Sequence, residues 1–139
     1  MKRILTVVLA VMLLAGLVAA CGSSGKYKDG EYSVESKADK YGNNATLKLT
    51  IKGDKIVAVD WKELANGVEK GADYGKVNGA IDNQDNYDKA QAALKLSKTF
   101  GEKLLAAQDA SKIDGVSGAS NSLDLFKTLV TEALNKAKK

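Results

Sequence analysis

The residues best suited to chemistry lie together in the polar stretch Asp114–Ser122, near the end of the chain. Two glycines and three hydroxyl side chains gather there: Gly115, Ser117, Gly118, Ser120 and Ser122. Glycines permit a tight turn, and Ser and Asn are favoured types at a helix start. Because the free backbone N–H groups and the dipole of a helix start favour an anion, the stretch indicates a phosphate site. An ordinary capped helix after a glycine turn is the alternative.

The composition of the 139-residue chain removes most other chemistry from its side chains. Without histidine there is no imidazole ligand for a metal and no Ser–His or Cys–His pair. The single cysteine, Cys21, excludes an intrachain disulfide and a cysteine-cluster metal site, so we predict no metal centre. The net charge of +4 is too small to favour nucleic acid as a partner. Redox chemistry would therefore need a bound group that supplies the reacting atoms.

The polar stretch also resembles a motif of a known family. Six residues follow its order and spacing: Asp114, Ser117, Gly118, Ala119, Ser120 and Ser122. The motif is the flavinylation motif of the FMN-binding domain family, which includes the FMN subunits of the Rnf and Nqr electron-transport complexes. The family also includes FMN-carrying lipoproteins of extracellular electron transfer, some of them known as pheromone-precursor lipoproteins.

The resemblance implies a covalently bound FMN cofactor. In that family the last hydroxyl of the motif receives FMN through a phosphoester, installed by an FAD:protein FMN transferase, and this position is Ser122. Serine stands here where the family more often has threonine. Outside the motif, Tyr27–Tyr32 and Leu49–Val59 resemble the family's opening strand and hairpin. Gly67, Lys70 and Tyr74 resemble the family's loop with the order Gly, Lys, Tyr.

The N-terminus has the pattern of a targeting signal. Lys2 and Arg3 precede an uncharged apolar run that ends at Ala20, one residue before Cys21. Small residues before a cysteine resemble a bacterial lipobox. We therefore expect a signal peptide over 1–20, a lipidated Cys21 with a flexible tether over 21–29, and an FMN-binding domain over 30–139. A retained transmembrane anchor is the alternative.

The residue pattern around the polar stretch predicts an α+β fold, in which a small antiparallel meander packs against two C-terminal helices. These elements would position the polar stretch. Alternation of apolar and polar residues predicts strands over 30–36, 45–52 and 55–61, with a tight turn at Gly53–Asp54. Apolar residues at helical spacing predict helices over 88–108 and from 120 to the terminus, with a possible bend at Gly101. The segment 82–88 is expected to be a turn.

The segment Gly67–Gly79, with a glycine at every fourth residue, is predicted to be a surface loop. It is either a flexible connection or a bare backbone against which a flat ligand lies. Three aromatic residues are candidates to contact a flavin ring: Tyr41, Trp61 and Tyr74. Trp61 shares a predicted face with Val57 and Val59, so a place in the core is its alternative.

Two charged residues have open roles. Lys70 is either close to the negative charge of a reduced flavin or a solvated surface lysine. Asp114 either braces its turn or is recognised by the transferase.

The function expected from these features is electron transfer without catalysis on a substrate. The protein would be an extracytoplasmic, lipid-anchored flavoprotein at the cell membrane, and its donor a membrane dehydrogenase or a quinone-linked protein. Two alternatives stay open: a module that binds FMN or another anion non-covalently, and a precursor whose signal peptide yields a secreted peptide signal.

Overall fold

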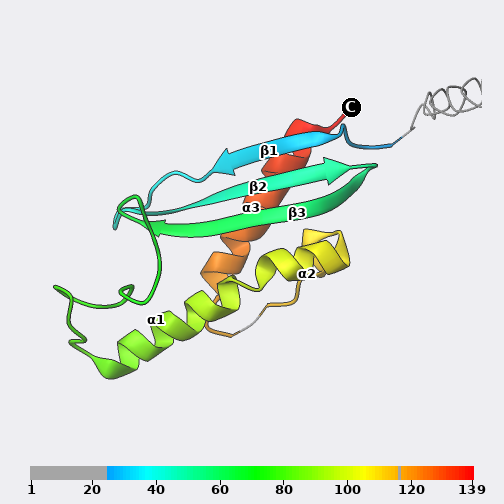
Figure 1. Ribbon diagram of the computed structural model, residues 1–139. Helices are drawn as coiled ribbons and strands as arrows, with labels where there is room; N and C mark the ends of the chain where they lie inside the picture. Colours follow the sequence, from blue (N-terminus) through cyan, green and yellow to red (C-terminus); the bar gives the residue numbers. More distant parts are fainter. Residues whose placement is uncertain (1–24, 116) are drawn as a thin grey trace, which may run out of the picture.

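Within the described residues, a four-stranded antiparallel sheet and three α-helices form an α+β fold, which confirms the predicted fold class (Figure 1). The computed structural model describes residues 25–115 and 117–139. The strands follow each other in space as in sequence: β1 (Gly30–Glu35), β2 (Asn43–Lys52), β3 (Lys55–Ala65) and β4 (Val68–Glu69). The helices are α1 (Gln84–Ser97), α2 (Phe100–Ala107) and α3 (Ser120–Ala137), with a short 3-10 turn, η1 (Ala110–Lys112), before α3.

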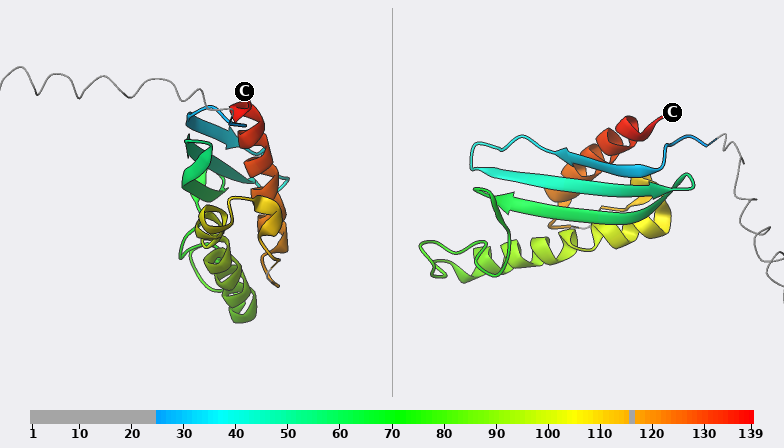
Figure 2. Two further views of the ribbon diagram at one scale, coloured as in Figure 1. Left: turned by 90° about the vertical axis from the view of Figure 1, so that its right-hand side faces the viewer. Right: turned by 45° about the horizontal axis from the view of Figure 1, so that its top comes forward.

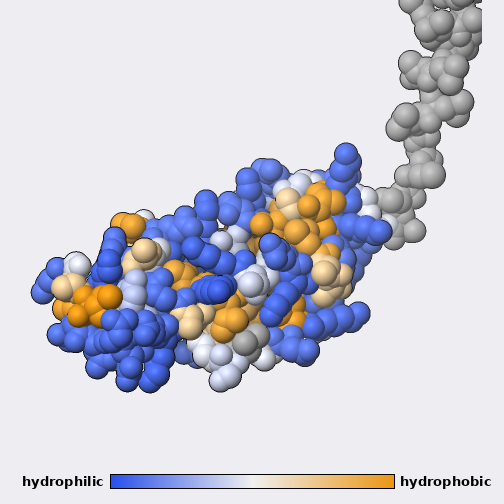
Figure 3. Space-filling model, turned by 60° about the horizontal axis from the view of Figure 1, so that its bottom comes forward, coloured by the Kyte–Doolittle hydropathy of each residue, from blue (hydrophilic) through white to orange (hydrophobic). Residues whose placement is uncertain are grey.

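The sheet and the helices form two layers. Helix α3 lies against β1 and β2, and α2 lies against β3 on the same face (Figure 2). Helix α1 continues past the end of the sheet (Figure 1). Seen from the side of α1 and α2, the surface is mainly hydrophilic, with apolar groups in separate patches (Figure 3). One buried core therefore joins the inner faces of the sheet, α2 and α3.

The central hairpin forms as its sequence predicts. Ala45, Leu47 and Leu49 alternate with polar residues along β2 and are buried, so one face of the strand meets the helices. Gly53 and Asp54 close the hairpin with φ of 57° and 66°. Positive φ at both central residues is the condition for the two-residue turn that matches strand twist, so the predicted hairpin is confirmed.

A β-bulge in β3 changes which of its residues face the core. Ile51 pairs with Ile56 and Thr50 with Ala58, so Val57 is left as an extra residue. Val57 is consequently 50% exposed, and the prediction that it shares a face with Val59 and Trp61 is wrong.

Beyond the bulge the odd-numbered residues point inward. Val59 and Trp61 pack against the core, and Glu63 is buried two residues further along β3. The bulge thus determines that a carboxylate from β3 lies on the helix side of the sheet.

Aromatic residues fill the centre of the core. The apolar stripe of α3 is buried as predicted, with Phe126 fully enclosed. The Phe126 ring contacts Trp61 edge-to-face at 5.1 Å between centroids, and Phe100 at 5.5 Å. The indole Nε1 of Trp61 donates a hydrogen bond to Ser97 Oγ at 2.8 Å. The structure therefore places Trp61 in the core between β3, α1 and α3.

The segment predicted as one helix over 88–108 is two helices, and it begins earlier. Asn83 Oδ1 accepts a hydrogen bond from the backbone N–H of Asn86, which starts α1 at Gln84, inside the predicted turn. The helix breaks at Lys98 and Thr99, not at Gly101. Thr99 Oγ1 donates to the carbonyl of Leu96 at 2.7 Å, and this local bond competes with the helical pattern.

Gln108, the residue at the C-terminal end of α2, forms hydrogen bonds with the backbone of β3 through its side chain. Gln108 Nε2 donates to the carbonyl of Ile56, and Gln108 Oε1 accepts from the Ile56 N–H, both at 2.8 Å. These bonds serve a backbone segment that β4 does not reach, because β4 pairs with Leu64 and Ala65 at the other end of β3.

Replacing Gln108 by alanine is expected to lower the free energy of unfolding by about 1–3 kcal/mol, because two backbone groups of Ile56 lose their partner. Chemical denaturation measures the change. The matched control is Gln84→Ala, which removes an exposed bond to Asp88 and should cost less than about 0.5 kcal/mol. Equal losses in the two variants would contradict the assigned role of Gln108.

The first described residues are hydrogen-bonded to the β2–β3 turn and to the end of α3. Tyr27 N–H donates to Asp54 Oδ1 at 2.7 Å, and Lys28 N–H donates to the Ala137 carbonyl at 2.8 Å. These residues lie in the segment that the sequence assigns to the tether. The predicted signal peptide and Cys21 lie outside the described residues. Within the described part of the chain, no helix is long and apolar enough to cross a membrane.

Candidate functional site

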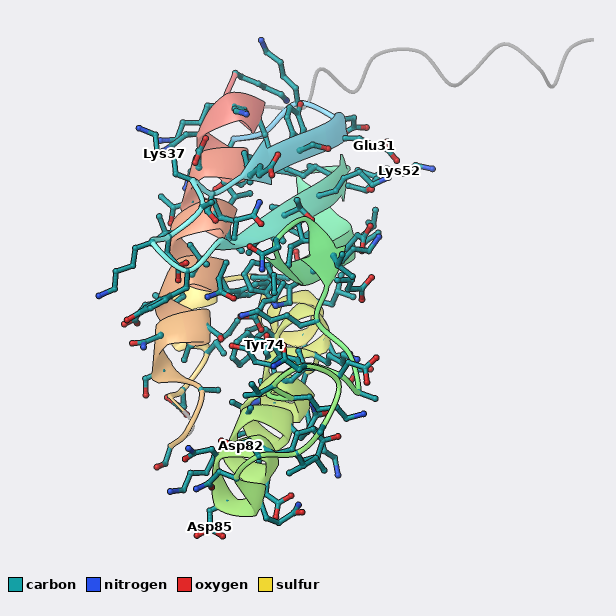
Figure 4. The ribbon with its side chains drawn as sticks, turned by 90° about the vertical axis from the view of Figure 1, so that its left-hand side faces the viewer. Glu31, Lys37, Lys52, Tyr74, Asp82 and Asp85 are labelled. Atoms are coloured by element: carbon teal, nitrogen blue, oxygen red, sulfur yellow. The ribbon has the colours of Figure 1, made fainter. Side chains whose placement is uncertain are left out.

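A cavity of about 630 Å³ opens where the start of α3 meets one end of the sheet. This volume is within the range that small-molecule cofactors occupy. Its wall combines the β1–β2 connection, the end of β3, the glycine-rich loop, α1 and the first turn of α3. The lining residues are Ser36, Lys37, Asp39, Asn43, Asn44, Glu63, Lys70, Tyr74, Ala93, Gly118, Ala119, Ser120, Asn121, Ser122 and Leu125. In the view along this end of the molecule, Tyr74 lies between α3 and α1 (Figure 4).

The start of α3 faces this cavity without a side-chain cap. Ala119 occupies the N-cap position, and no side chain of the described residues accepts a capping bond there. The first helical bond runs from Leu123 N–H to the Ala119 carbonyl, so the N–H groups of the three preceding residues have no partner inside the helix. Ser120 therefore begins the helix and does not cap it, in contrast to the ordinary-cap alternative. The N–H groups and the dipole of an 18-residue helix are suited to a phosphate.

The Ser122 hydroxyl is held by a buried carboxylate. Ser122 Oγ donates a hydrogen bond to Glu63 Oε1 at 2.7 Å. Ser122 is half-buried, and Glu63 is only 8% exposed because the bulge turns it toward the helices. A carboxylate in such a place needs polar partners, and the hydroxyl is the nearest one.

A buried lysine completes the charged part of the site. Lys70 Nζ lies 4.0 Å from Glu63 Oε1 and 4.3 Å from the centre of the Tyr74 ring. The Lys70 side chain is 9% exposed, so the structure does not support the solvated surface lysine. The Lys70 N–H also donates to the Glu63 carbonyl at 2.8 Å, which extends the β3–β4 pairing to the site. The predicted residues Lys70, Tyr74 and Ser122 are therefore brought together.

The glycine-rich loop, Gly67–Gly79, is hydrogen-bonded to α1 through Gln91. Gln91 Nε2 donates to the carbonyls of Gly71 and Tyr74, at 3.1 Å and 2.7 Å. A Cβ on Gly75 would lie 3.0 Å from the Ala90 Cβ, so a glycine is needed there for the close approach of the loop to the helix. Packing against α1 thus explains the bare backbone at Gly75 and fixes the position of Tyr74 over the cavity.

Other predicted residues lie outside the lining of this cavity. Asp114 and Ser117 are exposed in the turn before α3, and Val116 lies outside the described residues. Trp61 packs in the core, and Tyr41 is 69% exposed beside Lys40. The second half of the motif, Gly118–Ser122, therefore forms the wall of the cavity, and the first half forms the turn that leads into it.

Sequence reasoning missed Glu63 and the polar residues of the β1–β2 connection. The predicted strand stopped at Trp61, although two more residues of the same alternation lead to Glu63. The connection is organised by Asp39, whose Oδ1 accepts the N–H groups of Tyr41 and Asn43 at 2.8 Å and 2.9 Å. Asp39 and Asn43 both line the cavity.

The protonation of Asp39 is expected to change the stability of the β1–β2 connection. The hydrogen bond from the Asn43 backbone, assisted by the Asn43 side chain, lowers the pKa of Asp39 below its ordinary value of 3.8. A lowered pKa means that the contribution to stability is complete above the unfolded value and is lost as pH falls through the folded value.

We therefore expect the Asn43 amide resonance to titrate with a midpoint below 3.8, as followed by NMR. In the Asp39→Ala variant that titration should vanish. A midpoint at or above 3.8 in the unsubstituted protein would contradict the role assigned to Asp39.

Comparison with other proteins shows the family and the fold of the chain. Residues 41–135 match the family model of the FMN-binding domain, so the chain belongs to the FMN-binding domain family. Flavin binding is thus the property that defines its class, and an electron carrier is consistent with it. No curated protein matches the chain.

Two solved structures share the fold. A crystal structure of a Clostridium perfringens protein is 24% identical with a TM-score of 0.58, over 80% of this chain and 88% of that one. A solution NMR structure from Clostridium thermocellum is 24% identical with a TM-score of 0.50, over 81% of this chain and 93% of that one. At this identity the two structures show a common fold.

Proposed function

We propose that the protein is a lipid-anchored electron carrier that holds FMN covalently through a phosphoester on Ser122. The observation that carries the proposal is the position of Ser122. Its hydroxyl is in the first turn of α3, on the wall of the cavity, and is hydrogen-bonded to Glu63, which lies 4.0 Å from Lys70 Nζ. A hydroxyl, a cation and an uncapped helix start are the groups that a phosphate ester would need at one place.

The residues of the site fit the two parts of FMN. The N–H groups at the start of α3 and the Lys70 ammonium favour the phosphate, whose remaining negative charge they would stabilise. Tyr74, Ala93 and Leu125 give the cavity apolar surface for a flat ring system. Bound FMN supplies the one- and two-electron chemistry that these side chains lack.

The ends of the domain support a membrane anchor that points away from the cofactor site. Tyr27 and Lys28 are hydrogen-bonded to the β2–β3 turn and to the end of α3. The lining of the cavity includes the β1–β2 connection and the end of β3. These two segments lie at the end of the strands opposite the β2–β3 turn (Figure 1). A ten-residue strand such as β2 spans about 30 Å. A chain held by lipid at Cys21 would therefore present its cofactor site away from the attachment point.

The remaining parts of the proposal come from the N-terminal pattern and the family. The signal peptide over 1–20 would direct the domain to the outer face of the cell membrane, where Cys21 is lipidated. An FAD:protein FMN transferase would load the cofactor. A membrane dehydrogenase or quinone-linked protein would supply electrons, which the carrier passes to another carrier or a terminal acceptor.

The experiment that tests covalent attachment is electrophoresis after boiling in detergent. The protein is produced together with an FAD:protein FMN transferase and then denatured. We expect yellow flavin fluorescence to stay with the polypeptide band. Fluorescence that leaves the denatured chain would contradict the proposal and favour a module that binds FMN non-covalently.

A further inference from the structure

Glu63 is placed to act on the one hydroxyl that the proposed function needs. Its carboxylate accepts a hydrogen bond from the Ser122 hydroxyl at 2.7 Å between oxygens, whereas its distance to Lys70 Nζ is 4.0 Å. The short contact of this buried carboxylate is therefore with the hydroxyl and not with the cation. Ser120, two residues earlier on the same cavity wall, is exposed.

We propose that Glu63 accepts the proton of Ser122 when this hydroxyl is joined to FMN, and that it thereby selects Ser122 among the hydroxyls of the stretch. The proposal rests on the proposed function, because it concerns the loading of that cofactor. A serine hydroxyl is a weak nucleophile until a base takes its proton, and a carboxylate already hydrogen-bonded to it is a suitable base.

The step balances with FAD as the co-reactant, bound by the transferase. Ser122 Oγ bonds to the phosphorus on the flavin side of the FAD pyrophosphate, and the bond from that phosphorus to the bridging oxygen breaks. FMN stays on the serine and AMP leaves. The hydroxyl proton passes to Glu63 and then to AMP or water. No atom is oxidised or reduced.

The positive charge of Lys70 would stabilise the flavinylated form of Ser122. A phosphodiester on Ser122 would place a negative charge beside the Glu63 carboxylate, and like charges at close range repel. The Lys70 ammonium lies 4.0 Å from Glu63 Oε1 and is held over the Tyr74 ring at 4.3 Å. A fixed, buried cation at this distance offsets the repulsion without movement of the backbone.

The test compares transfer rates among variants of the whole chain. Purified protein, FAD and an FAD:protein FMN transferase are mixed, and attachment to the Ser122 peptide is followed by mass spectrometry. Glu63→Gln keeps the size and an oxygen that accepts the hydrogen bond, but it removes the base. We expect kcat to fall about 100-fold or more, with KM for the protein unchanged, since the outer surface is the same.

Two further variants separate proton transfer from structure. Glu69→Gln removes an exposed carboxylate on β4 and should react at the unsubstituted rate. Glu63→Asp retains a carboxylate that is one methylene shorter, so it should react faster than Glu63→Gln. The melting temperature of each variant monitors the fold.

The outcomes are distinct for the two proposals. Normal loading of Ser122 in the unsubstituted protein, with equal kcat for Glu63→Gln, would overturn the role of Glu63 alone. Equal rates for Glu63→Asp and Glu63→Gln, at matching melting temperatures, would also overturn it. An unsubstituted protein that gains no FMN would overturn the proposed function as well.

Discussion

Replacing Ser122 by alanine is expected to abolish covalent FMN on the chain while the fold persists. The variant lacks the oxygen that would bond to phosphorus, and among the described residues no other hydroxyl donates a hydrogen bond to Glu63. The loss of one hydrogen bond should lower the free energy of unfolding by about 1–3 kcal/mol, because the Glu63 oxygen loses its nearest partner. Intact-mass analysis after production with the transferase measures the attachment.

Two variants are matched controls for this result. Thr128→Ala removes an exposed hydroxyl further along the same helix and should leave the FMN addition complete. Ser122→Thr keeps a hydroxyl at the same place and should also be loaded. An FMN addition that survives in Ser122→Ala would show that a different residue carries the cofactor.

The largest expected effect on stability comes from Phe126, one turn after Ser122 in α3. Phe126 is fully buried and contacts the rings of Trp61 and Phe100. Replacing it by alanine should lower the free energy of unfolding by about 3–5 kcal/mol, through lost burial and a cavity at the centre of the core. Since small domains have about 5–15 kcal/mol in total, this is a large fraction of the stability.

Urea denaturation followed by circular dichroism measures the effect of Phe126→Ala. Phe126→Leu fills most of the space and should lose less than half as much. A difference below about 1 kcal/mol between Phe126→Ala and the unsubstituted protein would contradict the central place of this ring in the core.

Much of the fold could be predicted because its strongest patterns are local. The alternation from Ala45 to Ile51 determines the buried face of β2, and helical spacing from Leu123 to Ala137 determines that of α3. The turn at Gly53–Asp54 is specified by residues that accept positive φ. Each pattern acts over a few neighbouring residues, so the sequence alone was sufficient.

The errors arise where a distant contact or a single side chain overrides the pattern. The bulge at Val57 shifts the alternation of β3 by one residue, and no local feature of the sequence marks it. The break at Thr99 depends on one hydroxyl bond to Leu96. The short strand β4 in the glycine-rich loop was not predicted, because its two residues are recognisable only from their pairing with Leu64 and Ala65.

The sequence predicted the chemistry of the candidate site, but only some of the residues that form it. Ser122, Lys70 and Tyr74 were identified from the sequence and meet at one cavity. Glu63 was missed because the predicted strand ended at Trp61, and because its contact is with a residue 59 positions away, which local spacing does not indicate. Trp61 was a candidate for ring contact, but the alternation that suggested a place in the core describes its packing better.

The most direct test of the account is the mass of the protein isolated from its native host, measured intact under denaturing conditions and then as peptides. The account predicts one FMN phosphoester per chain, carried by the peptide that contains Ser122. A chain whose Ser122 is unmodified in that material, with no flavin retained after denaturation, would contradict it.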